Sequence, residues 1–287
     1  MQLLKFALFI SLCFTTMITE AQQALNVMTF NLRYNNTSDS LNAWPYRKDL
    51  AASQVKFFNV HILGVQEALD DQIQDLQQHL PNYKHAGVGR NDGKTKGEYS
   101  AIFYDTTRLF CLKNATFWLS QTPDEAGSKG WDAVLPRIVT WCFFEDKRTH
   151  KKFYAFNTHF DHIGKVARAE SAKLLLQKIK EMAGSLPVIV TGDFNATEDD
   201  EPIKIMMDKN NPGHLTESIT ISQMPHYGPT GTFNAFKSKE ISDKAIDHIF
   251  IKNKVTVLKH GTISESWNGR FSSDHFPALA VVEAPIP

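Results

Sequence analysis

The segment VIVTGDFNATEDD, residues 188–200, changes abruptly from apolar, β-branched residues to glycine and polar side chains. Val188 to Val190 predict a buried strand, because consecutive apolar β-branched residues are typical of strands covered on both faces. Asp193 and Asn195 follow where this strand emerges. Residues two apart on an extended chain point to the same side, so these two side chains can face one target. An ordinary turn explains the same residues, and the rest of the chain has to decide between the two interpretations.

The composition indicates a globular protein without a broad basic surface. Of the 287 residues, 42% are hydrophobic and 22% are charged, which is ordinary for a chain that buries a large core. Basic and acidic residues both number 31, so the formal net charge is zero. This balance does not favour nucleic acid as a partner, although a local basic groove remains compatible with it. No repeat or linker divides residues 22–287, so we expect one domain. We also expect a monomer.

The first residues have the pattern of a targeting segment. MQLLKFALFISLCFTTMITEA, residues 1–21, has an early lysine, an apolar stretch and small residues near Ala21. This is typical of a secretory signal peptide, and an ordinary N-terminal helix is the alternative. We therefore expect export to the periplasm or the medium, with no transmembrane segment in the mature chain. Cys111 and Cys142 then remain, either as a disulfide or as two buried thiols.

Periodicity predicts many strands and only a few helices. This pattern favours two sheets packed face to face with helices outside, an α/β sandwich. The loop at 87–98, GVGRNDGKTKGE, contains GKT but has Val88 where a phosphate-binding P-loop needs glycine, so we interpret it as a surface loop. We expect strands at 25–33, 61–68, 98–105, 110–119, 137–146, 152–160, 188–195, 246–251, 254–260 and 275–283, and helices at 45–58, 70–80, 168–184 and 201–209.

Polar side chains recur where the expected strands end. Charged groups beside buried strands are costly unless they are paired or coordinated, and functional groups collect on loops that a rigid scaffold positions. A polar or charged residue at the end of one strand is common. The same kind of residue at the ends of many strands indicates that these side chains form one site. The residues concerned are Asn31, Glu67, His159, Asp193, Asn195, Asp247, His248, Asp274 and His275.

These side chains have the chemistry of a site for a hard divalent cation. Glu67, Asp193 and Asp274 offer anionic oxygens, and Asn31 and Asn195 offer neutral ones. Such a set suits Mg²⁺ or Mn²⁺ and lacks the cysteine and histidine cluster that zinc prefers. A metal of this kind stabilises charge on a phosphoryl oxygen. A histidine beside a carboxylate, such as His275 with Asp247, is suited to proton transfer.

The order of the motifs resembles one protein family. TFN, QE, GE, NTH, GDFN, IDH and SDH follow one another from Asn31 to His275, as in the endonuclease/exonuclease/phosphatase superfamily with the deoxyribonuclease I-like fold. The resemblance implies a four-layer α/β/β/α sandwich of two mostly antiparallel sheets with outer helices. It also implies that residues 22–287 form one domain of this family, acting with Mg²⁺ or Mn²⁺.

The resemblance also assigns expected roles. Glu67 resembles the principal metal-binding glutamate, and Asn31 and Asp274 resemble further metal-site residues. His159 and His275 resemble the two active-site histidines and are expected to contact phosphate, as is Arg137. Two alternatives remain for the attacking water: Asp193 and Asn195 orient it, or the Asp247–His275 pair activates it. The other expected site residues are Glu98, which supports His159, and Arg33, for which a solvated surface charge is the alternative.

We therefore expect a metal-dependent phosphoesterase that hydrolyses a phosphomonoester or a phosphodiester by in-line attack of water. The alternatives are a secreted nuclease acting on DNA or RNA and a non-catalytic module that binds a phosphate ligand. Deoxyribonuclease relatives carry a basic residue two places after the QE glutamate, where this chain has Leu69. This departure argues against cleavage of duplex DNA, and NTHFDH and PTGTF resemble the exonuclease, deadenylase and phosphatase branches. Trp267, Asp161, His162 and His248 receive no catalytic role, and the two histidines are interpreted as structural or as groups that support the catalytic residues without touching substrate.

Overall fold

Two six-stranded sheets form the centre of the protein, for which a computed structural model describes residues 24–237 and 242–283. The expected signal peptide, residues 1–21, lies outside the described residues. The first sheet has the order β11 (Thr256–Thr262), β12 (Ala278–Glu283), β1 (Leu25–Asn31), β2 (Ile62–Gln66), β4 (Ile102–Asp105) and β3 (Tyr83–Ala86). The second has the order β5 (Leu109–Trp118), β6 (Ile138–Asp146), β7 (Lys152–His159), β8 (Val188–Asp193), β10 (Asp247–Lys252) and β9 (Thr216–Glu217).

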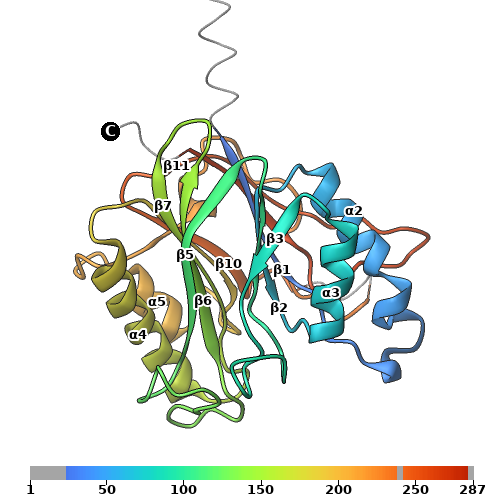
Figure 1. Ribbon diagram of the computed structural model, residues 1–287, viewed down its shortest axis with the longest axis horizontal. Helices are drawn as coiled ribbons and strands as arrows, with labels where there is room; N and C mark the ends of the chain where they lie inside the picture. The colour runs from blue at the N-terminus through green and yellow to red at the C-terminus, as the bar shows by residue number, and fades with distance from the viewer. Residues whose placement is uncertain (1–23, 238–241, 284–287) are drawn as a thin grey trace, which may run out of the picture.

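Helices cover the outer faces of this pair of sheets. In Figure 1, α2 (Lys48–Phe57) and α3 (Asp70–His79) lie beside the first sheet, whereas α4 (Lys165–Ala183) and α5 (Glu201–Met207) lie beside the second. Within the described residues, β1 pairs with β2 and β7 with β8 in parallel, and the other strand pairs are antiparallel. The α/β/β/α sandwich of mostly antiparallel sheets is therefore confirmed.

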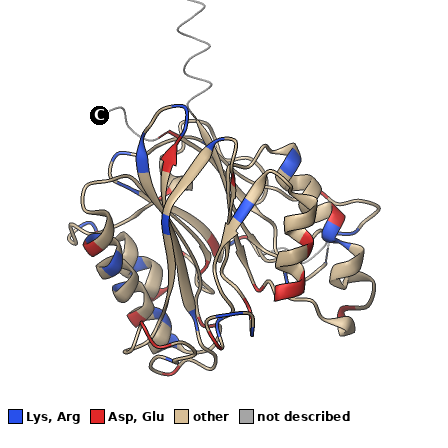
Figure 2. Ribbon diagram, in the orientation of Figure 1, with Lys and Arg blue, Asp and Glu red and all other residues tan. Residues whose placement is uncertain are grey.

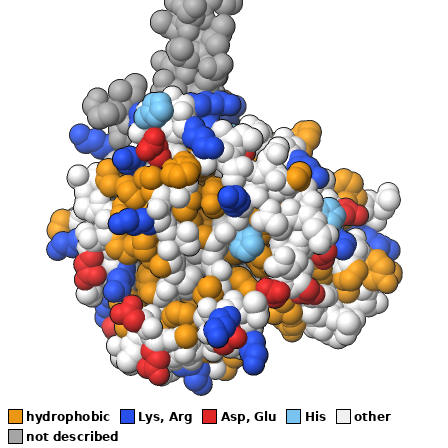
Figure 3. All heavy atoms as spheres, in the orientation of Figure 1, with side chains coloured by type: hydrophobic (Ala, Val, Ile, Leu, Met, Phe, Trp, Pro, Cys, Tyr) orange, Lys and Arg blue, Asp and Glu red, His pale blue; other side chains and the backbone are white. Residues whose placement is uncertain are grey.

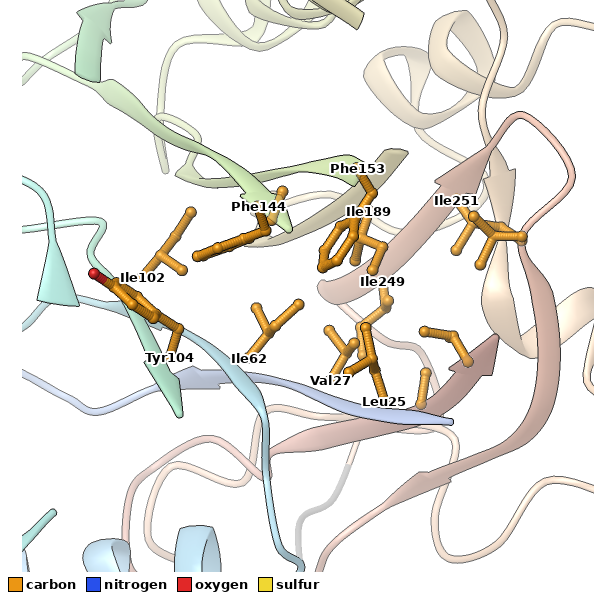
Figure 4. Packing of buried hydrophobic residues seen from close by; sticks show 14 of the residues in the cluster. Leu25, Val27, Ile62, Ile102, Tyr104, Phe144, Phe153, Ile189, Ile249 and Ile251 are labelled. Carbon is orange, nitrogen blue, oxygen red and sulfur yellow. The ribbon is translucent and has the colours of Figure 1, made fainter. Parts of the chain in front are cut away.

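Three apolar layers hold the sandwich together. Residues of alternate positions on β1 and β7, such as Val27 and Phe153, meet between the sheets, and Figure 4 shows Val27 and Ile62 facing Phe153 and Ile189 across this space. The outer faces bury separate clusters against α2 and α3 on one side and against α4 and α5 on the other. Side chains of a strand alternate between two faces, so strands covered on both faces are apolar throughout, as the run Val188–Val190 predicts.

A buried polar cluster joins the two sheets near the ends of β1, β2, β7 and β8. Asn157 accepts hydrogen bonds from Gln66 Nε2 at 2.7 Å and Thr191 Oγ1 at 3.0 Å, and it donates to the carbonyls of Val65 and Ala101. Gly64 makes room for it, because a Cβ there would lie 2.2 Å from Thr191 Oγ1. The cluster fixes how the sheets stack directly beside the residues that end their strands.

Most expected elements form with small shifts of their ends, and the exceptions are short. The strand expected from residue 98 begins at Ile102, and the helix expected from Pro45 is a 3-10 turn, Trp44–Tyr46, followed by α2. β3 and β9 were not predicted. Cys111 and Cys142 are free thiols. Within residues 24–237 and 242–283, the helices are all too short or too polar to cross a membrane.

Candidate active site

The strand ends named above converge on one pocket. Parallel pairing places His159 at the end of β7 beside Asp193 at the end of β8, and antiparallel pairing places Asp247 on the other side of Asp193. The pocket has a volume of about 530 Å³. It is lined by Arg33, Tyr34, Glu67, Glu98, Leu135, Arg137, His159, His162, Asp193, Asn195, Phe233, Ile246, Asp274 and His275. Asn31 and Asp247 lie behind this lining and are buried.

Asn31 holds the carboxylates of Glu67 and Asp193 together at the bottom of the pocket, which we call its floor. Its Nδ2 donates to Glu67 Oε1 at 3.0 Å and to Asp193 Oδ2 at 2.8 Å, while its Oδ1 accepts the backbone N–H of Arg33 at 2.9 Å. Glu67 Oε2 accepts the N–H of Tyr34 at 3.2 Å. The amide therefore presents its nitrogen, and not its oxygen, to the acids.

Three residues that follow strand ends have left-handed backbone conformations. The φ angles are 55° at Arg33, 62° at Glu67 and 47° at Asn195. Residues other than glycine adopt this region at a cost, and such residues cluster at functional sites. The sharp change of direction after each strand turns these side chains toward the pocket.

His275 forms a buried pair with Asp247. Its Nδ1 lies 2.8 Å from Asp247 Oδ2, and its Nε2 lies 3.9 Å from Asp193 Oδ2. Burial opposes a charge on His275, but Asp247 and then Asp193 raise its pKa well above the ordinary value. The ring of Phe233 packs edge-on against His275 at 5.0 Å between centroids. These acids therefore favour the cationic form of His275.

His159 lies opposite, in different electrostatic surroundings. Burial, together with Arg137 and Arg90, lowers its pKa well below the ordinary value, so the ring is neutral. Asn195 Nδ2 lies 3.0 Å from its Nε2, whereas its buried Nδ1 has no hydrogen-bond partner among the described residues and lies 3.9 Å from Glu98 Oε2. Because Asn195 donates to Nε2, the hydrogen of the neutral ring is on Nδ1.

Two further ion pairs position the cations of the pocket. Arg137 donates from Nε to the buried Asp161 at 3.3 Å and from Nη2 to His162 Nδ1 at 2.9 Å, and its buried Nη1 has no partner within the described part of the chain. Arg33 binds Asp39 through Nε and Nη2 at 3.0 and 3.1 Å, and its Nε lies 3.9 Å from Asp274. Arg137 is thus fixed with one donor unsatisfied at the pocket wall.

Burial disfavours the negative charges of the floor. The pKa of Asp193 is raised to about 7 by burial and by Asp247, against the effects of His275 and of hydrogen bonds from Asn195 and Asn31. Burial also raises the pKa of Asp274 and of Glu98, and nearby Glu67 adds to both shifts. Glu67, His159 and Asp193 each offer one ligand atom within 4.8 Å of the others. A cation among these groups would offset their repulsion.

Several residues that shape the site carried little signal in the sequence. Arg90 belongs to the loop interpreted as surface, yet it is buried and binds Glu98 through two bonds of 2.6 and 2.8 Å. Arg47 is buried and donates to the carbonyls of Leu32, Arg33 and Ser272, which ties the end of β1 to the segment before Asp274. His248 is structural, as predicted, and lies against Glu217. Trp267 lies away from the site, in a pocket with Phe57 and Phe58.

Comparison with known proteins agrees with this arrangement. A profile of the endonuclease/exonuclease/phosphatase family matches residues 28–275. The chain belongs to this family. An endonuclease/exonuclease/phosphatase from Bacteroides vulgatus is 42% identical, with 91% of this chain and 99% of that chain covered and a TM-score of 0.87. A mannosyl-6-phosphatase from Bacteroides thetaiotaomicron is 41% identical, with 91% and 100% covered and a TM-score of 0.83.

A more distant relative matches over a similar length. An uncharacterized protein of Acanthamoeba polyphaga mimivirus is 26% identical over 276 residues, which are 91% of this chain and 100% of that protein. The endonuclease/exonuclease/phosphatase family consists of hydrolases that act on phosphoester bonds, and this protein is a hydrolase of that kind. The expected family and the expected enzyme class are therefore confirmed.

Proposed function

We propose that the protein is a metal-dependent phosphatase that removes the phosphate monoester of a sugar phosphate. The observation that carries this proposal is a pair of buried donors without partners among the described residues, Arg137 Nη1 and His159 Nδ1, in residues that line one pocket. Buried donors without acceptors are costly, and a phosphate group would supply acceptors for both. The relative that is 41% identical over its whole length is a mannosyl-6-phosphatase, which supports a hexose 6-phosphate as the substrate class.

The shape of the pocket supports a small ester. Its floor is polar, whereas Tyr34, Leu135, Phe233 and Ile246 add apolar surface to its lining, which suits the apolar face of a sugar ring. Basic and acidic residues are interspersed along the ribbon in Figure 2, and their side chains are interspersed over the face seen in Figure 3. A formal net charge of zero does not favour the general electrostatic attraction to polynucleotides that nucleases use.

The donor set fits a hard divalent cation. We propose that Glu67 and Asp274 hold Mg²⁺ or Mn²⁺, because both are carboxylates of the pocket lining and no cysteine among the described residues lines it. Asn31 would orient these ligands through its hydrogen bond to Glu67. When bound, the cation would neutralise charge on the phosphoryl oxygens.

Side chains of the pocket are proposed to bind the phosphate, to accept the proton of the attacking water and to orient these groups. Cationic His275 and Arg137 would bind phosphoryl oxygens and stabilise the charge that develops in the transition state, with neutral His159 as a further donor. Asp193 is the group we propose to take the proton from the attacking water, since its pKa of about 7 is close to neutral pH. Asn195 fixes Asp193 by donating its backbone N–H to Oδ1 at 2.9 Å. Asp247 keeps His275 protonated and oriented.

A substrate panel tests this function. Purified protein with Mg²⁺ or Mn²⁺ should release phosphate from mannose 6-phosphate faster than it cleaves bis-p-nitrophenyl phosphate or a single-stranded oligonucleotide, and excess EDTA should abolish the reaction. Glu67→Gln and His275→Ala should be inactive, whereas His248→Gln, outside the pocket, should keep the specificity of the wild type. Faster cleavage of the oligonucleotide would indicate a nuclease. Specific binding of a phosphate ester without turnover would indicate the non-catalytic module.

Export is a separate proposal. We infer that residues 1–21 form a cleaved signal, on the sequence pattern described above. N-terminal sequencing of protein recovered from the periplasm or the medium should begin at Gln22. Recovery of the uncut chain from the cytoplasm alone would contradict it.

A further inference from the structure

His162 is an exposed residue of the pocket lining, three residues beyond His159. Both rings contribute to the lining, but His159 is buried whereas His162 is exposed. Arg137 and His159 are buried residues of the lining, each with a donor that has no partner among the described residues, and the phosphate group is proposed to bind beside them. A group that extends from a phosphate held there toward solvent runs along the exposed part of the lining, to which His162 belongs, so His162 is placed to contact the leaving group.

Arg137 determines which nitrogen of His162 carries a hydrogen. Its Nη2 lies 2.9 Å from His162 Nδ1. A guanidinium has only donors, so Nδ1 must be the acceptor in this contact. An imidazolium has no lone pair to accept with, and the contact therefore requires a neutral ring with its hydrogen on Nε2. His162 is thus prepared as a neutral hydrogen-bond donor through Nε2.

A buried carboxylate holds this arrangement in place. Asp161 Oδ1 accepts the backbone N–H groups of Ile163 and Gly164 at 3.0 and 2.8 Å, which closes the turn that carries His162. Asp161 Oδ2 accepts from Arg137 Nε at 3.3 Å and from the backbone N–H of Val134 at 3.2 Å. One anion therefore fixes both the turn that carries His162 and the guanidinium that orients its ring. This preorganisation lowers the entropy cost of using the ring in binding.

We propose that His162 determines specificity for a hydroxylated leaving group, by donating a hydrogen bond from Nε2 to a hydroxyl oxygen of the sugar. This rests on the phosphatase function proposed above and assigns His162 a part of the substrate other than the phosphate. In this arrangement His162 contributes a binding contact to the leaving group. Its loss should therefore change the choice of substrate.

The decisive comparison uses two phosphomonoesters that differ in leaving group. With the metal-loaded enzyme, His162→Ala should lower kcat/KM for mannose 6-phosphate by about 3–10-fold, the worth of one neutral hydrogen bond, and leave that for phenyl phosphate unchanged. His162→Gln should retain more activity toward the sugar phosphate, because its amide can accept from Arg137 and donate to the substrate. His150→Ala, an exposed histidine in the turn between β6 and β7, is the matched control and should change neither.

An equal loss for both substrates would overturn the proposal, since it would place the contact on the phosphate. No loss for either substrate would overturn it as well. If the wild type hydrolyses no phosphomonoester, the proposed function fails, and calorimetry still decides the role of His162. The wild type should then bind mannose 6-phosphate more tightly than inorganic phosphate, and His162→Ala should lose that preference. An unchanged preference would reject the assignment.

Discussion

Asn31 and Asp193 end strands of different sheets and are joined by a hydrogen bond of 2.8 Å. The same amide nitrogen reaches Glu67 at 3.0 Å, so one side chain sets the spacing of two carboxylates that come from opposite halves of the sandwich. The site therefore depends on how the sheets stack and not on either sheet alone.

Removal of this amide should loosen the proposed metal site. We expect Asn31→Ala to lower kcat/KM by about 10–100-fold, as is usual when a group that orients ligands is lost, and to weaken activation by Mg²⁺. Steady-state kinetics at several Mg²⁺ concentrations measure both effects. Asn210→Ala removes an amide that donates to Asp208 in an exposed turn and should behave as the wild type. Unchanged Mg²⁺ activation in Asn31→Ala would show that the amide does not orient the ligands.

The sequence predicted the strands that carry the site, because each is a run of apolar residues with a clear polar end. Val188–Asp193 and Lys152–His159 formed as expected, and the endings meet because parallel and antiparallel register align them. Strands β3 and β9 were not predicted. The sequence of β3, YKHA, has only a weak alternation of buried and exposed residues, and β9, Thr216–Glu217, is too short to show a pattern. Such strands form because a neighbouring edge offers hydrogen bonds.

The supporting residues of the site were harder to predict for a related reason. Arg90 lies in an irregular loop rich in glycine and lysine, and only the tertiary fold brings its guanidinium to Glu98 and buries it. Asp161 and His162 follow His159 directly, but their sequence does not reveal that Arg137, 25 residues before His162, binds both. Contacts between distant segments produce no periodic pattern in the local sequence. Only the residues at the strand ends could therefore be predicted.

The Asp247–His275 pair should control the alkaline side of the pH profile. Asp247 raises the pKa of His275 well above its ordinary value, although burial opposes this. If the cationic ring binds phosphate, activity falls as the pH rises through that pKa, and Asp247→Asn should move the fall to lower pH. Profiles of kcat/KM against pH measure this shift. The control is Glu217→Gln, which disrupts the buried contact between Glu217 and His248 of β10. This variant should lose activity at the same alkaline pH as the wild type. If the alkaline fall in kcat/KM stays at the same pH in Asp247→Asn, deprotonation of His275 is not its cause.

Asp193 should make the metal-free protein less stable as the pH rises. The folded protein keeps its proton up to a pKa of about 7, whereas the ordinary value is 3.8. The folded state therefore binds more protons between these values, and the free energy of unfolding falls with rising pH. Thermal unfolding in EDTA should show Asp193→Asn more stable than the wild type at pH 8, with a smaller difference at pH 5. Asp243→Asn, an exposed acid, should show no such trend, and a trend of the opposite sign for Asp193→Asn would contradict the assignment.

The polar cluster between the sheets should contribute both stability and alignment of the site. Asn157 has no solvent exposure and serves four partners: Gln66, Thr191 and the carbonyls of Val65 and Ala101. Asn157→Ala leaves several of these groups buried without partners, each at about 1–3 kcal/mol, so we expect a loss of about 3 kcal/mol or more in urea unfolding. Activity should fall too, because Gln66 directly precedes Glu67. Asn114→Ala, on the exposed side of β5, should cost little. A loss equal to that control would show that the sheets are aligned by apolar packing alone.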